Sequence, residues 1–262
     1  MHVIWGCGAR TFIEMGNNSL QHVSLCLLSY QRPEMFYQSF VSLEKSLVGA
    51  ANRCEIIVND DCSTDPRMVE LLCKLHIDGR ISSLILNAAG KNSGNQGVGE
   101  SFRKALGVSS GEYVIKADAD LLYRRDWLDG AIEIMETFPI ISNLGAFHYY
   151  HSPVHADECY IKTVEENGIC AELVKDSVGS FMLMRREMLE NIPWTSHSNG
   201  FAEDFVWKRE TEKAGFYCAL PVNDFCQNVG FGLGRSTVCY ADSNSENGIA
   251  VTKIHNTPLL FP

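Results

Sequence analysis

Residues 113–120 form the stretch that most restricts what this chain can fold into. An apolar run enters the stretch, and two carboxylates one residue apart, Asp118 and Asp120, close it. This pattern predicts a β-strand that crosses the core and delivers both side chains to the carboxyl edge of a sheet, where open α/β sheets bind their ligands. Carboxylate oxygens suit Mg²⁺ or Mn²⁺, and these ions bind phosphates. We therefore expect this edge to bind a nucleotide diphosphate together with a divalent cation.

Three further apolar runs precede this strand, and helical segments separate the four. Strands are expected at residues 22–28, 55–58 and 82–86, and helices at 33–47, from Pro66 onward and at 100–108. Strands that alternate with helices at these lengths predict right-handed βαβ units and a mainly parallel sheet flanked by helices. The fold class is therefore α/β, with a nucleotide-binding type of layer in the first half.

The second half of the chain mixes short strands and helices in a weaker pattern. Helices are expected at residues 126–138, 186–191 and 200–214, and strands at 144–147, 177–184 and 216–220. Periodicity fades over residues 148–175. This region is expected to form a variable loop or a short hairpin near the substrate.

Net charge, cysteine pattern and hydropathy argue against several classes of protein. The formal net charge of −10 opposes the broad positive field that a nonspecific nucleic-acid binder needs. Ten cysteines without a Cys-x-x-Cys pair predict buried thiols in a reducing compartment, and hence a soluble cytoplasmic protein, rather than disulfides or a zinc site. The sequence lacks an apolar run of about 18 residues, so we expect no membrane span.

Four segments carry a resemblance to a known family. They are the first strand and turn at residues 23–32, the second strand and acidic loop at 55–65, the carboxylate strand at 111–120, and a late acidic pair within 201–205. In this order and spacing they resemble the family-two glycosyltransferases of the GT-A fold, over residues 22–235. Asp-x-Asp alone is a weak signal, whereas four segments in the family's order make a specific one.

The resemblance implies a domain organisation and a reaction. We expect one GT-A domain at residues 22–235, with a nucleotide-sugar-binding half at 22–122 and a mixed acceptor and catalytic half at 123–235. An N-terminal extension at 1–21 and a C-terminal tail at 236–262 would flank it. The implied reaction is the inverting, metal-dependent transfer of a hexosyl group from a nucleotide sugar, expected to be a UDP-sugar, to an acceptor hydroxyl. A glycan, a protein, a lipid-linked sugar and a modified base all stay open as the acceptor.

The same resemblance implies the ligands of a Mn²⁺ or Mg²⁺ ion. Asp120 matches the carboxylate that binds the ion directly, and Asp118 matches the one that contacts the ribose or acts through water. Many relatives carry a metal-binding His after the late acidic pair, whereas this chain has Asn228, whose amide oxygen is a weaker ligand. The site would then rely on Asp120, the diphosphate and water. The alternative for the two aspartates is a helix N-cap beside an exposed acid.

The same resemblance implies that the residues at the ends of the first two strands bind the donor. Asp60 and Asp61 match paired acids that face the nucleotide base, and a carboxylate can accept a hydrogen bond from the imide N–H of the base. The turn with Ser29 and Tyr30 would lie beside the ring. Arg32 fits a contact with the diphosphate or the base.

Alternatives stay open for these donor-binding residues. One is an Asx-turn that leaves Asp60 free to bind and is built by its neighbours Asp61, Ser63, Thr64 and Asp65. Arg32 can equally be a solvated charge at a helix start. Asn95 and Arg103 are further candidates for donor binding, although many relatives have Asn in place of Arg103.

Catalysis is implied for the late acidic pair. Asp204 matches the general base that takes the proton from the acceptor hydroxyl as this attacks the anomeric carbon, and Glu203 would orient the acceptor. Gly179 and Ser180 would lie on the acceptor side. The alternative is that both acids only complement the N-terminus of a helix.

Two other functions stay open. A nucleotidyltransferase also combines an α/β sheet with paired acids and Mg²⁺, but it normally needs a Gly-rich, basic loop after the first strand. Residues 29–33 lack such a loop. A carbohydrate-binding or nucleotide-binding protein with little or no turnover is the second alternative, and Asn228 in place of His is the feature that favours it.

Overall fold

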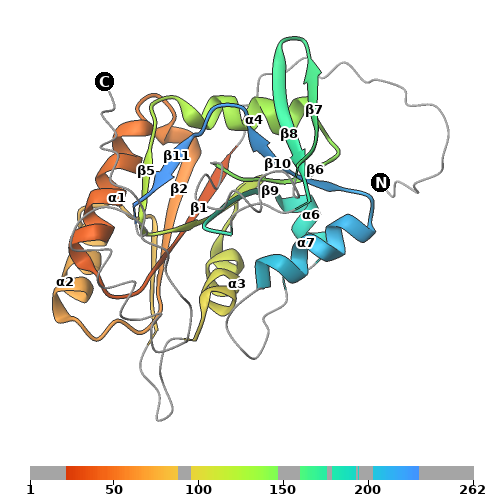
Figure 1. Cartoon of the computed structure of the whole chain (residues 1–262). Helices are drawn as coiled ribbons and strands as arrows, with labels where there is room; N and C mark the ends of the chain where they lie inside the picture. Colours follow the sequence, from red (N-terminus) through yellow and green to blue (C-terminus); the bar gives the residue numbers. More distant parts are fainter. Residues whose placement is uncertain are drawn as a thin grey trace, which may run out of the picture.

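The core of the fold is a mixed sheet that begins with four parallel strands. The computed structural model describes residues 22–87, 96–146, 160–175, 179–192, 194 and 203–229. Within them, the sheet contains nine strands in the order β3-β2-β1-β4-β9-β6-β10-β8-β7. The parallel strands are β1 (Val23–Ser29), β2 (Cys54–Asp60), β3 (Ser83–Leu86) and β4 (Tyr113–Asp118) (Figure 1). Their carboxyl ends therefore meet at one edge of the sheet.

Alternation along the parallel strands gives the sheet two apolar faces. In β1, Val23, Leu25 and Leu27 belong to one core, whereas Cys26 and Leu28 belong to the other. This arrangement explains why these strands appear in the sequence as continuous apolar runs rather than alternating ones.

Helices cover both faces of the sheet. The first core contains apolar side chains of α1 (Pro33–Ser46), α2 (Pro66–Ile77) and α4 (Trp127–Thr137). The second contains those of α3 (Val98–Val108), α6 (Arg186–Asn191) and α7 (Glu203–Lys213). A proline occupies the first turn of both α1 and α2, where its missing N–H costs nothing. A short 3₁₀ turn, η1 (Ala51–Arg53), leads into β2.

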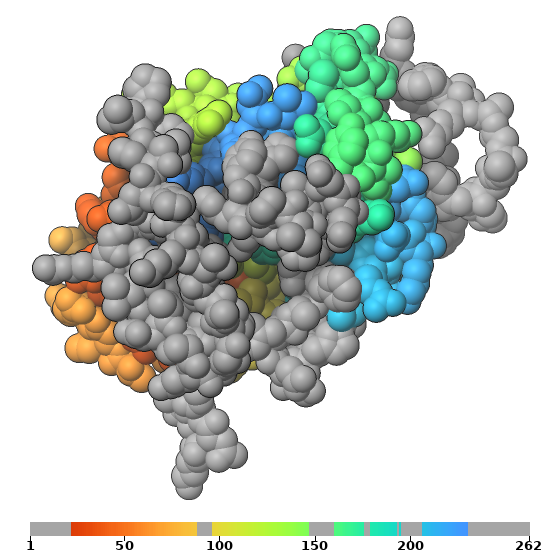
Figure 2. Space-filling model, viewed as in Figure 1, coloured from red at the N-terminus to blue at the C-terminus, as the bar shows by residue number. Residues whose placement is uncertain are grey.

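The second half of the chain extends the sheet with strands of both directions. β9 (Phe181–Arg185) runs antiparallel between β4 and β6 (Ile141–Leu144), and β10 (Tyr217–Pro221) runs parallel to β6. A hairpin of β7 (Tyr160–Glu166) and β8 (Ile169–Val174) completes the sheet. In the space-filling view the hairpin is visible at the upper right (Figure 2).

The hairpin explains part of the region in which periodicity fades. Asn167 and Gly168 form its turn with positive φ angles of 54° and 81°, as a two-residue Asn-Gly turn requires. The expectation of a short hairpin is confirmed for residues 160–174, whereas residues 148–159 lie outside the described part of the chain.

Two expected strands are displaced in the structure. The strand expected at residues 144–147 is β6, which ends at Leu144. Two polar residues of this strand, Ser142 and Asn143, are fully buried, and the Ser142 hydroxyl donates to the Tyr217 carbonyl oxygen at 3.1 Å. The strand expected at 177–184 begins only at Phe181, because Gly179 and Ser180 form a turn.

A second, two-stranded sheet was not predicted. β5 (Leu121–Tyr123) follows directly after the carboxylate strand and pairs antiparallel with β11 (Cys226–Asn228). The α/β class, the mainly parallel first half and the mixed second half are confirmed. None of the helices in the described residues has the length and apolar character needed to cross a bilayer.

Candidate active site

The ends of three parallel strands and the start of β9 meet at one edge of the sheet. The register pairs Ser29 with Asp60 and Leu28 with Asp118. The backbone N–H of Asp118 donates to the carbonyl oxygen of Ser180 at 2.8 Å. The predicted donor-binding, metal-binding and acceptor-side positions of these strands therefore share one edge.

The two carboxylates of the motif differ in exposure. Asp120 is 3% exposed, whereas the Asp118 side chain is 32% exposed. Asp120 accepts a hydrogen bond at Oδ1 from Asn228 Nδ2 at 3.2 Å, and Arg32 Nη1 lies 3.7 Å from its Oδ2. The pairing of β11 with β5 holds Asn228 in this position, and the Val229 N–H donates to the Asp120 carbonyl oxygen at 2.8 Å. Two predicted metal-site residues, Asp120 and Asn228, are thus in direct contact.

The surroundings of Asp120 raise its pKa. Burial is the largest cause and the charge of Asp118 is the next, while Arg32 and Lys116 act in the opposite direction, and the pKa becomes about 6. Two close carboxylates form an oxygen-rich pair that suits a hard divalent ion. Among the described residues, groups of three or more His, Cys, Asp or Glu side chains that could hold a metal are absent. A metal here would therefore need oxygens from a ligand or from water.

Lys116 lies beside the Asp118–Asp120 motif, although the sequence pattern did not predict it as a site residue. Its side chain is 2% exposed. Its Nζ donates to the carbonyl oxygen of Gly179 at 2.5 Å and lies 3.2 Å from Asp118 Oδ1. The signal that could have found it is its spacing, because Lys116 and Asp118 are two residues apart on a strand and face the same side.

Arg32 follows an unusual turn at the end of β1. Both Gln31 and Arg32 have positive φ angles, 54° and 57°, which residues other than glycine rarely adopt. The turn directs the chain from β1 into α1 and places the guanidinium near Met35 Sδ, at 3.5 Å, and near Asp120. Backbone strain of this kind is frequent where a side chain is positioned for function.

Asp60 is engaged in the turn that follows β2. Its Oδ1 accepts from the Ser63 N–H at 2.8 Å. Its Oδ2 accepts from the hydroxyls of Ser63 at 2.6 Å and of Ser29 at 3.1 Å. The expectation that Asp60 stays free while its neighbours build the turn is therefore wrong, because Asp60 is itself the acceptor around which the turn closes.

Asp61 caps a helix that lies far from it in the sequence. Its Oδ1 accepts from the Gln96 N–H at 2.8 Å and its Oδ2 from the Gly97 N–H at 3.0 Å, immediately before α3. Burial raises the pKa of Asp61 above its ordinary value. The carboxylate satisfies backbone donors that the first turn of a helix leaves unpaired.

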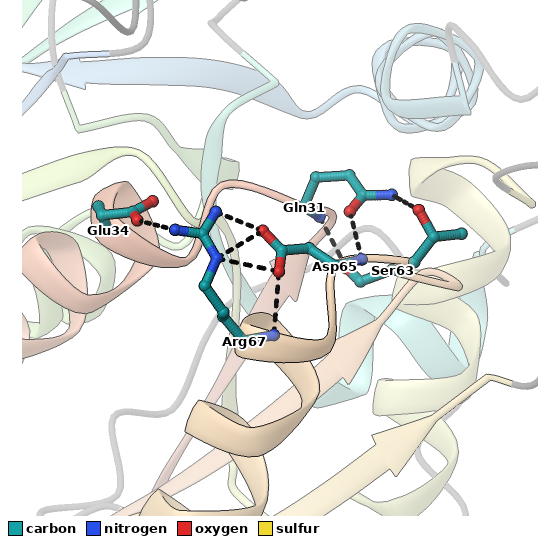
Figure 3. Close-up of polar contacts among 6 residues, drawn as sticks. Gln31, Glu34, Ser63, Asp65 and Arg67 are labelled. Atoms are coloured by element: carbon teal, nitrogen blue, oxygen red, sulfur yellow. Dashed lines mark hydrogen bonds and ion pairs between the residues drawn. The ribbon is translucent and has the colours of Figure 1, made fainter.

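Gln31 fastens the turn after β1 to the loop after β2. Its backbone N–H donates to Ser63 Oγ at 2.7 Å, and its Nε2 donates to Thr64 Oγ1 at 2.9 Å. Its Oε1 accepts from the Asp65 N–H at 3.0 Å (Figure 3). The sequence gives little sign of this role, because Gln31 lies between two predicted elements.

An exposed ionic cluster borders the same loop. Arg67 pairs with Asp65 at 2.6 Å and with Glu34 at 2.8 Å, which joins the first turns of α1 and α2 (Figure 3). Asp65 also accepts from the Arg67 backbone N–H at 2.9 Å and caps α2. The loops after β1 and after β2 are thus joined both by the hydrogen bonds of Gln31 and by the ion pairs of Arg67.

The remaining predicted residues differ in how much the structure says of them. Tyr30 is 41% exposed at the end of β1. Arg103 lies on the outer side of α3, where its exposed guanidinium pairs with Glu100 at 2.6 Å, so no described contact links it to the motif. Glu203 and Asp204 begin α7, and their side chains lie outside the described residues, as does Asn95.

More than half of the chain matches one family model. The family model of Glycosyl transferase family 2 matches residues 24–193. This range contains the strands β1 to β4, the Asp118–Asp120 motif and β9. No curated protein matches the chain.

Solved structures with the same fold are also found among glycosyltransferases. The mannosyltransferase PcManGT from Pyrobaculum calidifontis, in complex with GDP-Man and Mn²⁺, has a TM-score of 0.60 at 17% identity, covering 79% of this chain and 56% of that chain. S. aureus TarS 1-349 in complex with UDP has a TM-score of 0.60 at 16% identity, covering 78% and 59%. GalNAc-T7 with UDP, GalNAc and Mn²⁺ has a TM-score of 0.59 at 11% identity, covering 86% and 48%. At these identities the likeness shows the fold, and this chain spans about half the length of these proteins.

Proposed function

Because the chain belongs to glycosyl transferase family 2, we propose that it transfers a sugar from a nucleotide sugar to an acceptor hydroxyl. The observation that carries this proposal is the meeting of Asp118 and Asp120 with Asp60 and Ser29 at one carboxyl edge. That edge is where open α/β sheets bind nucleotides. Nucleotides and nucleotide sugars in the solved structures of the same fold, GDP-Man and UDP, support it.

We further propose a UDP-sugar as the donor, bound at the ends of β1 and β2. Tyr30 is exposed there and can stack on a base. Asp60 accepts three hydrogen bonds, and a carboxylate offers roughly four acceptor positions. One position can therefore accept from the imide N–H of uracil, while Ser29 and Ser63 keep the carboxylate fixed.

The donor set at the end of β4 fits Mn²⁺ or Mg²⁺. Asp120 and Asp118 would hold the ion, with the remaining positions taken by diphosphate and water oxygens, as is usual for Mg²⁺. When bound, the ion would neutralise charge on the leaving diphosphate. For Asn228 to contribute its amide oxygen, the amide has to turn over, because Nδ2 donates to Asp120. Arg32, 3.7 Å from Asp120, is suited to bind a phosphate oxygen.

The proposed catalytic base is Asp204 at the start of α7. In an inverting transfer it accepts the proton of the acceptor hydroxyl while this attacks the anomeric carbon from the face opposite the diphosphate. Glu203 would orient the acceptor. Gly179 and Ser180, joined to β4 through the bond between Ser180 and Asp118, would lie on the acceptor side.

The first experiment measures donor binding and hydrolysis. The protein is mixed with UDP-sugars and GDP-sugars in the presence of Mn²⁺ or Mg²⁺, and free nucleotide and thermal stability are followed. A nucleotide present at about 100 times its Kd should stabilise the fold by about 2.7 kcal/mol. Absence of any response to any nucleotide with either ion would overturn the proposal.

A binding protein with weak turnover is the second candidate. It is favoured by the amide of Asn228, which offers a weaker ligand than the imidazole of many relatives. An Asp204→Asn variant separates the two functions. Retained UDP binding with lost transfer supports catalysis, whereas equal transfer by variant and wild type eliminates Asp204 as the base.

A further inference from the structure

Lys116 is a charged side chain in an apolar layer of the sheet. It lies on β4 between Cys26 of β1 and Met182 of β9 in the strand register. Both neighbours, like Val114 on the same strand, belong to the second apolar core. With 2% of its side chain exposed, its ammonium group has lost most of its hydration, and such a charge persists in a fold only when it is paired.

The partners of Lys116 belong to the two sides of the candidate site. Asp118 Oδ1 lies 3.2 Å from Nζ, and the Gly179 carbonyl oxygen lies 2.5 Å from it. Among the described residues, Asp118 is the carboxylate within ion-pair distance of Lys116. The buried ammonium group of Lys116 therefore offsets the negative charge of one carboxylate of the motif, Asp118.

Arg32 lies beside the other carboxylate of the motif. Its Nη1 lies 3.7 Å from Asp120 Oδ2. Each carboxylate of the motif thus has one cationic side chain of the same chain near it. A bare divalent cation meets carboxylates whose charge is already offset, whereas a diphosphate is attracted by the positive charges of Arg32 and of the buried Lys116.

We propose that Lys116 is a built-in counter-charge that lowers the affinity of this site for a bare divalent cation and raises it for the diphosphate. The cation then binds chiefly together with the nucleotide. This inference rests on the proposed function, since it concerns the same donor site. It differs from a purely structural role of Lys116, which would be to hold the turn at Gly179.

The two roles predict different results for Mn²⁺ binding when the charge is removed. Lys116→Met and Lys116→Gln remove the charge, and the Gln variant keeps a donor for the Gly179 carbonyl oxygen. With the charge gone, Mn²⁺ alone should bind about tenfold more tightly, and UDP without a cation should bind about tenfold more weakly. Lys116→Arg keeps the charge and should leave both affinities within about threefold of wild type.

The measurements need no sugar donor and no turnover. Free Mn²⁺ is followed by its electron paramagnetic resonance signal during titration of the protein. UDP binding in EDTA is followed by calorimetry, and circular dichroism checks that each variant is folded. Lys213→Met is the matched control, because it removes one exposed lysine charge that pairs with Glu210 on α7.

Several outcomes overturn the inference. Neutral variants that bind Mn²⁺ no more tightly than wild type, or that bind both ligands more weakly, would assign Lys116 a structural role. Failure of both neutral variants to fold, while Lys116→Arg folds, would do the same. Failure of the wild-type protein to bind UDP at any Mn²⁺ concentration would instead overturn the proposed function. The Mn²⁺ affinity of the Lys116 variants is measured without nucleotide, so this result tests the inference separately.

Discussion

Asn228 donates a hydrogen bond from Nδ2 to Oδ1 of Asp120 at 3.2 Å, although the two residues are 108 positions apart in the chain. The antiparallel pairing of β11 with β5 brings them together, since Asn228 lies opposite Leu121. The amide thus occupies a position beside the proposed metal ligand, and this makes Asn228 the natural place to alter the metal affinity of the site.

An Asn228→His variant should need less metal. An imidazole is a stronger ligand than an amide oxygen and also suits Zn²⁺, so UDP binding should reach half-saturation at a roughly tenfold lower Mn²⁺ concentration. Calorimetric titration of UDP at fixed Mn²⁺ concentrations measures this. Gln227→His is the control, because adjacent residues of a strand face opposite sides. An unchanged Mn²⁺ dependence in Asn228→His would show that this position does not reach the ion.

Removal of the Asp120 charge should stabilise the protein in the absence of metal. Burial and Asp118 raise its pKa to about 6 from 3.8, so the native state holds the proton more tightly than the unfolded state does. Its contribution to stability is full below about pH 4, falls as the pH rises to about 6, and stays constant above that. An Asp120→Asn variant should therefore be more stable than wild type by roughly 3 kcal/mol at pH 7.

Urea denaturation between pH 4 and 8 in the presence of EDTA tests this pH dependence. The exposed carboxylate of Glu165 on β7 provides the control variant Glu165→Gln. A stability difference between Asp120→Asn and wild type that does not grow from pH 4 to pH 6 would contradict the expected linkage.

Asp61 should stabilise the fold through its cap on α3. In an Asp61→Ala variant the N–H groups of Gln96 and Gly97 lose their acceptor. Loss of a helix cap typically costs about 0.5–2 kcal/mol, and unsatisfied buried donors add to this. Urea denaturation should show a loss of about 2 kcal/mol, with an intermediate loss in Asp61→Asn, which keeps one acceptor oxygen. Equal stability of all three proteins would argue against the cap.

Gln31 should protect the loop after β2 from local opening. A Gln31→Ala variant loses the bonds to Thr64 and to the Asp65 N–H. We expect hydrogen exchange at the Asp65 amide to speed up several-fold, because its acceptor is gone. The exposed residue Gln38 on α1 gives the control Gln38→Ala. Unchanged exchange at Asp65 would show that the loop is held by its other contacts.

The main elements of the fold were predictable because their signals are local. The run at 113–118 and the helical spacing of Phe36, Phe40 and Leu43 depend only on neighbours in sequence. β5 and β11 have three residues each, too few for a periodic signal. Their pairing depends on a contact between segments about a hundred residues apart, which propensity does not reveal.

The site was predictable in composition but less so in the roles of its residues. Asp120 and Asn228 are in contact, although their role as metal ligands stays a prediction. Asp60 builds the turn that was assigned to its neighbours. Lys116 was missed because a lysine in a strand usually reaches solvent. Its burial follows from the turn at Gly179, which supplies the carbonyl acceptor, and that turn is 63 residues away.

The insertion of β9 between β4 and β6 also sets the order in which the site can assemble during synthesis. Until Phe181–Arg185 has left the ribosome, β4 lacks its antiparallel partner, and the strand that ends in Asp118 presents an apolar open edge. Such an edge pairs readily with other chains. The nascent chain should therefore need chaperone protection between the synthesis of β4 and that of β9, and a fragment that stops before β9 should aggregate rather than bind nucleotide.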